Sequence, residues 1–255
     1  MRRARVSLLT ALAALACVAA PVGAGATGGA APAVSAVEAD AYSNHWSGFS
    51  RVDGGFTTVR AHLVVPSVSN RCGAGSAAAL YVGLGGMGSG RFVQAGYTLT
   101  PNVGGIQGAW YEVMNDWTQP PPVVVPFVGR VGDRVGISVA YDRSHDALNV
   151  VWKNTTRGTT TRRTILTAHR WMPDRAHSIA DWITERPDVP TVGAPMASLS
   201  PVTWTSVSAV RDGHGFGLSA HLIRHTAVSV GGRVVAEASA GPGPRSFTST
   251  THHCT

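Results

Sequence analysis

The stretch Ala180-Asp181-Trp182-Ile183-Thr184-Glu185-Arg186 has the alternating pattern of a β-strand. Because side chains on a strand point to opposite faces in turn, Asp181, Ile183 and Glu185 share one face, and the residues between them share the other. A carboxylate on the same face as an apolar residue is costly to bury unless it is paired or used chemically. The stretch alone therefore leaves two interpretations open: Glu185 is a functional acid, or it is simply solvated at the strand end.

Short apolar segments broken by turns continue through the rest of the 255-residue chain. Thirty glycines and fifteen prolines interrupt them, and no window keeps a helical period over three turns. Residues 179–182 allow at most a single helical turn. Many short strands at near-regular spacing indicate an all-β sandwich or barrel. Besides the opening stretch, strands are expected at 59–65, 78–82, 108–113, 135–141, 148–152, 202–205, 216–222, 227–230 and 233–238.

The N-terminus predicts export. Met1-Arg2-Arg3-Ala4-Arg5 precedes an apolar run over 6–20, and Ala24-Gly25-Ala26 offers a cleavage site, which is the order of a secretory signal over 1–26. The apolar run is too short for a comfortable membrane span. Small residues and proline make 27–41 a linker or short pro-segment, so the ordered domain is expected over 42–255. We therefore expect a secreted protein with no membrane association after signal removal.

The charge pattern argues against a nucleic-acid partner. The formal charge is +7, from 21 basic and 14 acidic residues, and it falls to +4 without the three arginines of the signal. The remaining basic residues are scattered, whereas a nucleic-acid binder gathers them on one face.

Cysteine use agrees with export. Outside the predicted signal only Cys72 and Cys254 remain. Two cysteines in an exported chain suggest one disulfide, and the alternatives are two free thiols or a bond between chains.

Sequence motifs for cofactors, metals and catalytic nucleophiles are either absent or lack the surrounding elements that they require. Gly83-Leu84-Gly85-Gly86-Met87-Gly88 fits a dinucleotide-binding fingerprint, but it leads into another strand rather than a helix, so we expect a flexible hairpin loop there. The ten histidines contain no H-E-x-x-H, and no three ligands for zinc can be assembled. Neither a G-x-S-x-G motif nor a catalytic context for a cysteine is present, and we expect no cofactor and no metal.

Polar side chains stand out inside three apolar strand patterns: Gln94, Glu112 and Asp181. A glutamine amide can donate a hydrogen bond to a developing oxyanion and accept one from water. Six blocks that include these residues follow one another in order along the chain. They are Asn44-x-Trp46-Ser47-Gly48, Tyr81-Val82-Gly83-Leu84-Gly85-Gly86, Val93-Gln94-Ala95-Gly96, Ala109-Trp110-Tyr111-Glu112, Asn154-Thr155-Thr156 and Ala180-Asp181-Trp182-Ile183-Thr184-Glu185.

This ordered set resembles the glutamic peptidases, or eqolisins, from Asn44 to Ala238. The resemblance implies a sandwich of two antiparallel sheets of the concanavalin A-like jelly-roll type, and a secreted monomer of bacterial type that cuts protein or peptide substrates. It also implies a catalytic dyad of Gln94 and Glu185, in which Glu185 is the general base on a water and Gln94 stabilises the oxyanion. The residues implied to bind substrate are Trp46, Trp110, Tyr111 and Glu112.

The chain departs from the family pattern in the second block. Tyr81 replaces a tryptophan, and Gly85 stands where the family has an aspartate. The basic composition also differs from that of acid-adapted members, so subsite preference and pH optimum stay open. Tyr111 fits an aromatic core almost as well as a substrate cleft.

Two other function classes fit the same strands. A β-sandwich glycoside hydrolase would use Glu112 and Glu185 as paired carboxylates. A carbohydrate- or peptide-binding module would keep the fold without the reaction.

Overall fold

A computed structural model describes residues 37–86, 90–115, 118–167, 179–187 and 194–254. Within these ranges the chain is all strand and loop, apart from one short 3-10 turn at Asn70–Cys72. No helix in the described part is long and apolar enough to cross a membrane. The predicted signal over 1–26 lies outside the described residues.

One sheet carries strand β13, which is the stretch that opened the sequence analysis. Its strands lie in the following spatial order, with β8 and β9 both paired to β7: β1 (Val37–Ser43), β17 (Leu222–Val228), β2 (Trp46–Arg51), β13 (Ile179–Glu185), β5 (Ala78–Gly86), β6 (Arg91–Thr100), β7 (Gly105–Met114), β8 (Val123–Val125) and β9 (Gly129–Arg130).

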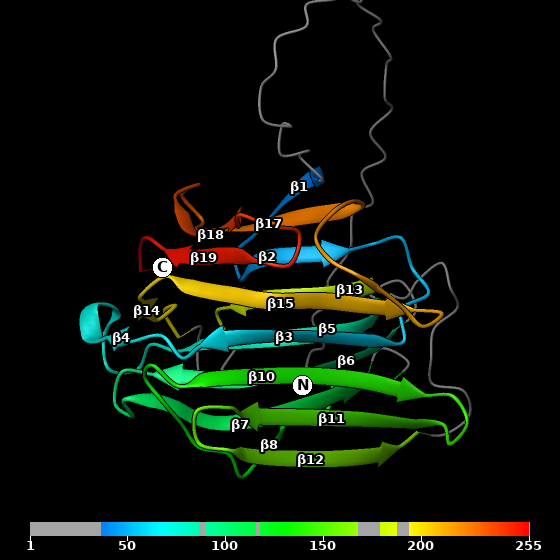
Figure 1. The fold of residues 1–255 in the computed structure, drawn as a ribbon. Helices are drawn as coiled ribbons and strands as arrows, with labels where there is room; N and C mark the ends of the chain where they lie inside the picture. The colour runs from blue at the N-terminus through cyan, green and yellow to red at the C-terminus, as the bar shows by residue number, and fades with distance from the viewer. Residues whose placement is uncertain (1–36, 87–89, 116–117, 168–178, 188–193, 255) are drawn as a thin grey trace, which may run out of the picture. The chain divides into compact units, whose positions relative to one another are not determined.

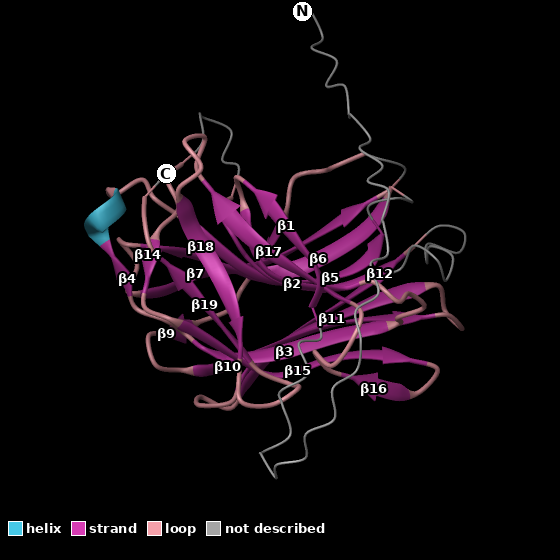
Figure 2. Cartoon of the chain, turned by 90° about the horizontal axis from the view of Figure 1, so that it is seen from above, coloured by secondary structure: helices cyan, strands magenta, loops and turns pink. Residues whose placement is uncertain are grey.

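The second sheet lies across the core from the first (Figures 1 and 2). In spatial order it contains β18 (Val234–Ala240), β19 (Phe247–Thr251), β15 (Val202–Arg211), β3 (Thr58–Val64), β10 (Arg134–Asp142), β11 (Ala147–Asn154) and β12 (Thr159–Leu166). Three short strands complete the set: β16 (His214–Phe216) pairs with β15, and β4 (Val68–Ser69) pairs with β14 (Ser198–Leu199).

Strand β18 pairs with both β17 and β19, so the two sheets are joined along one side. Among the named strands every pair is antiparallel except β1 with β17, which is parallel. Figure 2 shows β2, β5 and β6 in one layer and β3, β10 and β15 in the other. The prediction of an all-β sandwich of two antiparallel sheets is confirmed.

The core between the sheets follows from strand alternation. In β3, Val59, Ala61 and Leu63 are buried, whereas Arg60 and His62 between them point outward. The largest fully buried side chains are aromatic or leucine, and three of them are the tryptophans Trp152, Trp182 and Trp204. Apolar burial of this kind stabilises the fold by about 25 cal/mol per Å² of surface removed from water.

Polar groups of the buried aromatic residues tie the layers together. Trp182 of β13 donates from its indole Nε1 to the Arg60 carbonyl of β3, at 3.0 Å. Tyr97 of β6 donates from its hydroxyl to the Gly136 carbonyl of β10, at 2.9 Å. A buried indole or phenol needs such a partner, and here the partner belongs to the opposite sheet.

Strand β2 lies unusually close to β13. A Cβ atom on Gly48 would come within 2.1 Å of the Trp182 carbonyl oxygen, and Gly48 has a φ of +149°. Only glycine meets both conditions, which explains this residue in the Asn44-x-Trp46-Ser47-Gly48 block.

The structure corrects the predicted start of order. Strand β1 begins at Val37, inside the segment assigned to a linker, rather than near Tyr42. It is held by β17, nearly two hundred residues later in the chain, and Asp40 accepts from Arg224 of β17 at 2.7 Å. Composition at 27–41 could not reveal this pairing because the partner is distant in sequence.

Residues 179–182 belong to strand β13, in agreement with the strand predicted over 180–186. Two local predictions were wrong. The expected strand over 216–222 is instead the connection between β16, which ends at Phe216, and β17, which begins at Leu222; His221 within it has a φ of +55°. Gly83–Gly86 belongs to strand β5 instead of a loop, whereas 87–89 lies outside the described residues.

The predicted disulfide is confirmed. Cys72 and Cys254 are bonded with their Cα atoms 5.3 Å apart, and the bond joins the 3-10 turn to the C-terminal tail. It closes a loop with a sequence separation of 182 residues.

Replacing both cysteines by serine should lower the free energy of unfolding by about 5 kcal/mol, because the unfolded chain regains the entropy that the closed loop removes. Urea denaturation of parent and variant, with matched reductant-free buffers, measures the difference. Equal midpoints, or peptide mapping that finds both thiols free, would contradict this assignment.

Candidate active site

The strand register builds one polar row across the face of the first sheet that points away from the core. Pairing of β2, β13, β5, β6 and β7 places Ser50, Asp181, Gly83, Gln94 and Glu112 side by side. Because all five lie in register, their side chains point to the same side. The row brings two buried acids and one amide onto a single surface.

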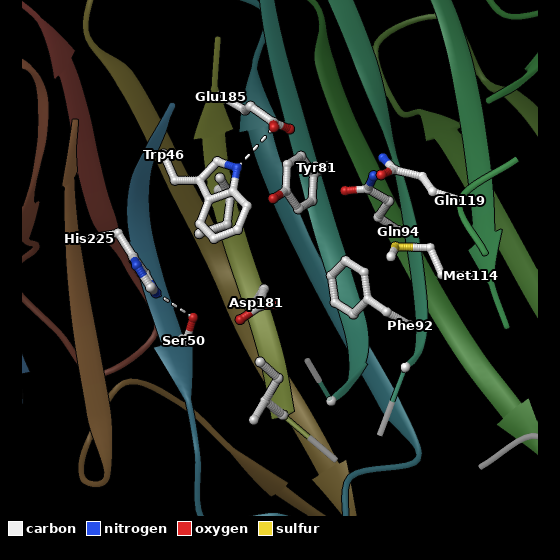
Figure 3. A pocket seen from close by; sticks show the side chains of 14 residues that line it. Trp46, Ser50, Tyr81, Phe92, Gln94, Met114, Gln119, Asp181, Glu185 and His225 are labelled. Atoms are coloured by element: carbon white, nitrogen blue, oxygen red, sulfur yellow. Dashed lines mark hydrogen bonds between the residues drawn. The ribbon is translucent and has the colours of Figure 1, made fainter. Parts of the chain in front are cut away.

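Glu185 lies on the same face, four residues along β13 from Asp181. Its Oε1 accepts a hydrogen bond from the indole Nε1 of Trp46, at 2.8 Å, and Trp46 is its register partner on β2. Figure 3 shows the Tyr81 ring between Glu185 on one side and Gln94 on the other. The two predicted dyad residues therefore face one shared space across Tyr81.

Gln94 is oriented by Glu112. The amide Nε2 donates to Glu112 Oε2 at 2.6 Å, and Glu112 is only 4% exposed. Since an amide nitrogen must face a carboxylate acceptor, the Gln94 carbonyl oxygen points the other way, toward Tyr81 (Figure 3). The second oxygen of Glu112 has no hydrogen-bond partner among the described residues.

A cavity of about 270 Å³ opens beside these groups. Gln94 and Glu185 both line it, together with Trp46, Tyr81, Phe92 and Asp181. Its walls are mainly apolar, with a few polar groups at fixed positions, which is the usual composition of a ligand site.

Asp181 is an unusual carboxyl in this cavity. It is 6% exposed, and its Oδ1 has no hydrogen-bond partner in the described part of the chain. Burial raises the pKa of Asp181 to about 7, although a hydrogen bond from Ser50 works in the opposite direction. Near neutral pH this group is therefore divided between its protonated and charged forms.

Ser50 and His225 do not form a nucleophilic triad with Asp181. The Ser50 hydroxyl lies 2.6 Å from His225 Nε2. Burial lowers the pKa of His225, which favours its neutral ring. In a triad the acid orients the histidine, whereas here Asp181 is the register partner of Ser50, and no hydrogen bond joins it to His225 among the described residues.

Two aromatic rings shape the cavity. The Phe92 ring lies over Gly83, where a Cβ atom would be 2.5 Å from the ring, so the missing side chain makes room for it. Burial, followed by the charges of Glu185, Asp181 and Glu112, raises the pKa of Tyr81 well above its usual value. Tyr81 is consequently a neutral phenol among three acids.

The departure at Gly85 also has a structural reason. Gly85 has a φ of +128°, and a Cβ atom there would lie 2.4 Å from the Arg91 carbonyl oxygen. An aspartate does not fit this backbone.

The structure brings together most, but not all, of the predicted site residues. Trp46, Gln94 and Glu185 line the cavity, and Glu112 supports Gln94. Trp110 lies on the same face of the sheet as Glu112 and packs against Tyr81, with ring centroids 6.0 Å apart. It does not line the cavity. The prediction for Tyr111 is wrong.

Tyr111 points into the core because it lies between Trp110 and Glu112 on a strand. Its ring centroid is 6.3 Å from that of Trp152 in the second sheet. The alternation of side chains excludes three consecutive residues from one cleft.

Sequence reasoning missed Ser50, Tyr81, Phe92 and His225 as cavity residues, and it gave Asp181 no role. Strand alternation could have identified two of them, because residues an even number of positions apart share a face. Phe92 lies two residues before Gln94, and Ser50 lies four residues after Trp46. His225 had no local signal, since only the pairing of β17 with β2 brings it to the site.

Asp181 predicts a specific pH dependence of stability. Its pKa of about 7 in the folded protein exceeds the value of about 3.9 in an unfolded chain, so the folded state binds the proton more tightly. Raising the pH from about 4 to 7 should therefore lower the free energy of unfolding, by up to about 4 kcal/mol from this group.

Asp181→Asn should lose that dependence, so the variant gains stability relative to the parent as the pH rises. Taking the difference between the two proteins cancels the opposite contribution of His225. Urea denaturation at several pH values measures it, and a difference that does not change over this range would contradict the buried, unpaired state of Asp181.

Comparisons with known proteins identify the family of the chain. The sequence model of the Peptidase A4 family matches residues 44–248. No curated protein sequence matches the chain.

Solved structures of glutamic peptidases have the same fold. Scytalido-glutamic peptidase bound to a peptide-based transition-state analogue is 20% identical with a TM-score of 0.64, covering 82% of this chain and 98% of that chain. SCP-B, an eqolisin in complex with the tripeptide Ala-Ile-His, is 20% identical with a TM-score of 0.59 and the same coverage. Aspergilloglutamic peptidase from Aspergillus niger is 21% identical with a TM-score of 0.52, covering 69% and 99%.

The family match extends over most of the chain and includes all six sequence blocks. The resemblance to the glutamic peptidases is thus confirmed. The protein belongs to the Peptidase A4 family and is a glutamic endopeptidase.

Proposed function

We propose that the protein is exported and cuts peptide bonds with a water molecule that Glu185 and Gln94 activate, without a covalent intermediate. The observation that carries the proposal is that both side chains line one cavity, on either side of Tyr81. The predicted signal over 1–26 supports export.

The reaction begins with proton transfer. The Glu185 carboxylate takes a proton from the water while the water oxygen bonds to the scissile carbonyl carbon. The indole of Trp46 holds the carboxylate in position through its hydrogen bond to Oε1. The Gln94 carbonyl oxygen, which faces this space, accepts the other hydrogen of the water.

The tetrahedral oxyanion needs a donor that is already in place. One N–H of the Gln94 amide is bound by Glu112, and the second N–H of that amide donates to the oxyanion. Glu185 then gives its proton to the amide nitrogen as the carbon–nitrogen bond breaks, which releases an acid and an amine and restores the carboxylate.

The substrate is a protein or peptide in extended form. Trp46, Tyr81 and Phe92 give the cavity aromatic walls against which peptide side chains can pack. A tripeptide complex of the similar SCP-B structure supports this choice of ligand class. We expect the enzyme to act as a monomer.

Glu185→Gln should reduce hydrolysis to background, because an amide cannot take the proton from water. Gln94→Ala should cost more than about 10²–10³ in rate, since the donor to the oxyanion and the acceptor for the water are lost together. Glu112→Gln should be milder, because its amide oxygen still accepts from Gln94. Rates on denatured casein and circular dichroism spectra measure these effects.

Glu237→Gln is the matched control, since Glu237 lies on β18 at the surface and bonds His252. It should retain parent activity. Severe loss for both Glu112 and Glu185 variants on a polysaccharide, with Gln94 tolerated, would point to a glycoside hydrolase. Casein left intact by the processed parent from about pH 2 to 8 would leave only a binding module.

A further inference from the structure

The cavity contains a carboxyl group that the proposed reaction does not use. Asp181 points into it from β13, beside Ile179 and Ile183 on the same face. More than nine-tenths of the residue is buried, and Oδ1 lacks a partner among the residues that the structure describes. A buried charge of this kind is costly unless another group compensates it.

The part of the chain that the structure describes supplies no compensating cation to this carboxyl. None of the described residues that line the cavity is a lysine or an arginine. Arg51, next to Ser50 on β2, points to the other face of the sheet and pairs with Asp53 at 2.7 Å. Since no described residue supplies a positive charge to Asp181, a bound molecule is a natural source of one.

The other titratable groups that face Asp181 strengthen this conclusion. His225 hydrogen-bonds Ser50, the register partner of Asp181, and burial lowers the pKa of His225, which favours its neutral ring. Tyr81 from β5 is neutral, and Glu185 and Glu112 on the same face are acids. Near neutral pH the described groups around the cavity are thus neutral or negative, which favours a cationic occupant.

We propose that this cavity is a specificity pocket, which takes a lysine or arginine side chain of the peptide substrate and pairs its cation with Asp181. The inference rests on the proposed peptidase function. It names the residue that selects the substrate, whereas Glu185 and Gln94 perform the reaction.

The size and walls of the cavity suit such a side chain. A volume of about 270 Å³ lies at the small end of ligand sites and matches one long side chain. Ile179, Ile183 and Phe92 provide apolar surface along which the methylene stem can lie. The Phe92 ring can also attract the cationic head.

Ionisation of Asp181 is coupled to this binding. A cation stabilises the charged carboxylate, so binding lowers the pKa of Asp181 from its raised value of about 7. The preference for a cationic side chain should accordingly be larger at about pH 8 than at about pH 5.

The test compares peptides that differ only in charge. Cleavage sites are first mapped on a denatured protein, and one cleaved peptide is then made with arginine or citrulline, and with lysine or norleucine, at each residue flanking the scissile bond. Binding is measured by calorimetry on Glu185→Gln, which leaves the peptide intact, and kcat/KM is measured on the parent enzyme.

At about pH 8 the arginine peptide should bind about tenfold or more tightly than the citrulline peptide at one flanking position, as expected for a charge-assisted hydrogen bond. Adding Asp181→Asn should bring that ratio close to one. Asp142→Asn, the same change at the end of strand β10 in the second sheet, should leave it unaltered.

A ratio near one in the parent background, or a ratio that Asp181→Asn does not alter, overturns the pocket assignment. Tighter binding of citrulline also overturns it, because a protonated Asp181 would then be selecting a neutral polar group. The two proposals fail separately: hydrolysis that survives in Glu185→Gln refutes the dyad alone, and hydrolysis by the parent without a charge preference refutes the pocket alone.

Discussion

The structure depends on the two opposite faces of one strand. On β13, Trp182 points into the core and donates to the Arg60 carbonyl of the facing sheet, whereas Asp181 and Glu185 point away from the core. The same seven residues therefore fix the distance between the layers and carry the acids of the site. The close approach of Gly48 locks β2 against this strand and brings Trp46 to Glu185.

Because the site is built on strands, its geometry is set by register rather than by loops. The row from Ser50 to Glu112 crosses five strands that are held by backbone hydrogen bonds and by the core beneath them. This rigid frame can maintain two buried carboxyl groups whose free energy would otherwise favour exposure or neutralisation. Glu112 is stabilised by Gln94, and Asp181 by Ser50. Each acid is left with one unpartnered oxygen among the described atoms.

Alternation and turn signals in the sequence predicted the fold class, and the two cysteines of an exported chain predicted the disulfide. The cavity residues Trp46, Gln94 and Glu185 were predicted from the resemblance to the glutamic peptidases. Alternation is a local property, and so are the Gly and Pro signals that separate strands. Two features were missed because they depend on pairing between strands that are distant in the sequence. Strand β1 was missed because its partner β17 is distant, and His225 was missed because the pairing of β17 with β2, equally distant in sequence, brings it to the site. Tyr111 was misplaced, although alternation along β7 puts it on the face opposite to that of Glu112, against the core.

The central claim is that Glu185, and not the in-register acid Asp181, acts together with Gln94. A crystal structure of the protein with a peptide analogue that carries a tetrahedral hydroxyl in place of the scissile carbonyl tests it most directly. We predict that the hydroxyl oxygen lies within hydrogen-bond distance of both the Glu185 carboxylate and the Gln94 amide, with a substrate side chain extending toward Asp181. A hydroxyl held by Asp181 or Ser50, with Glu185 out of contact, would contradict the account.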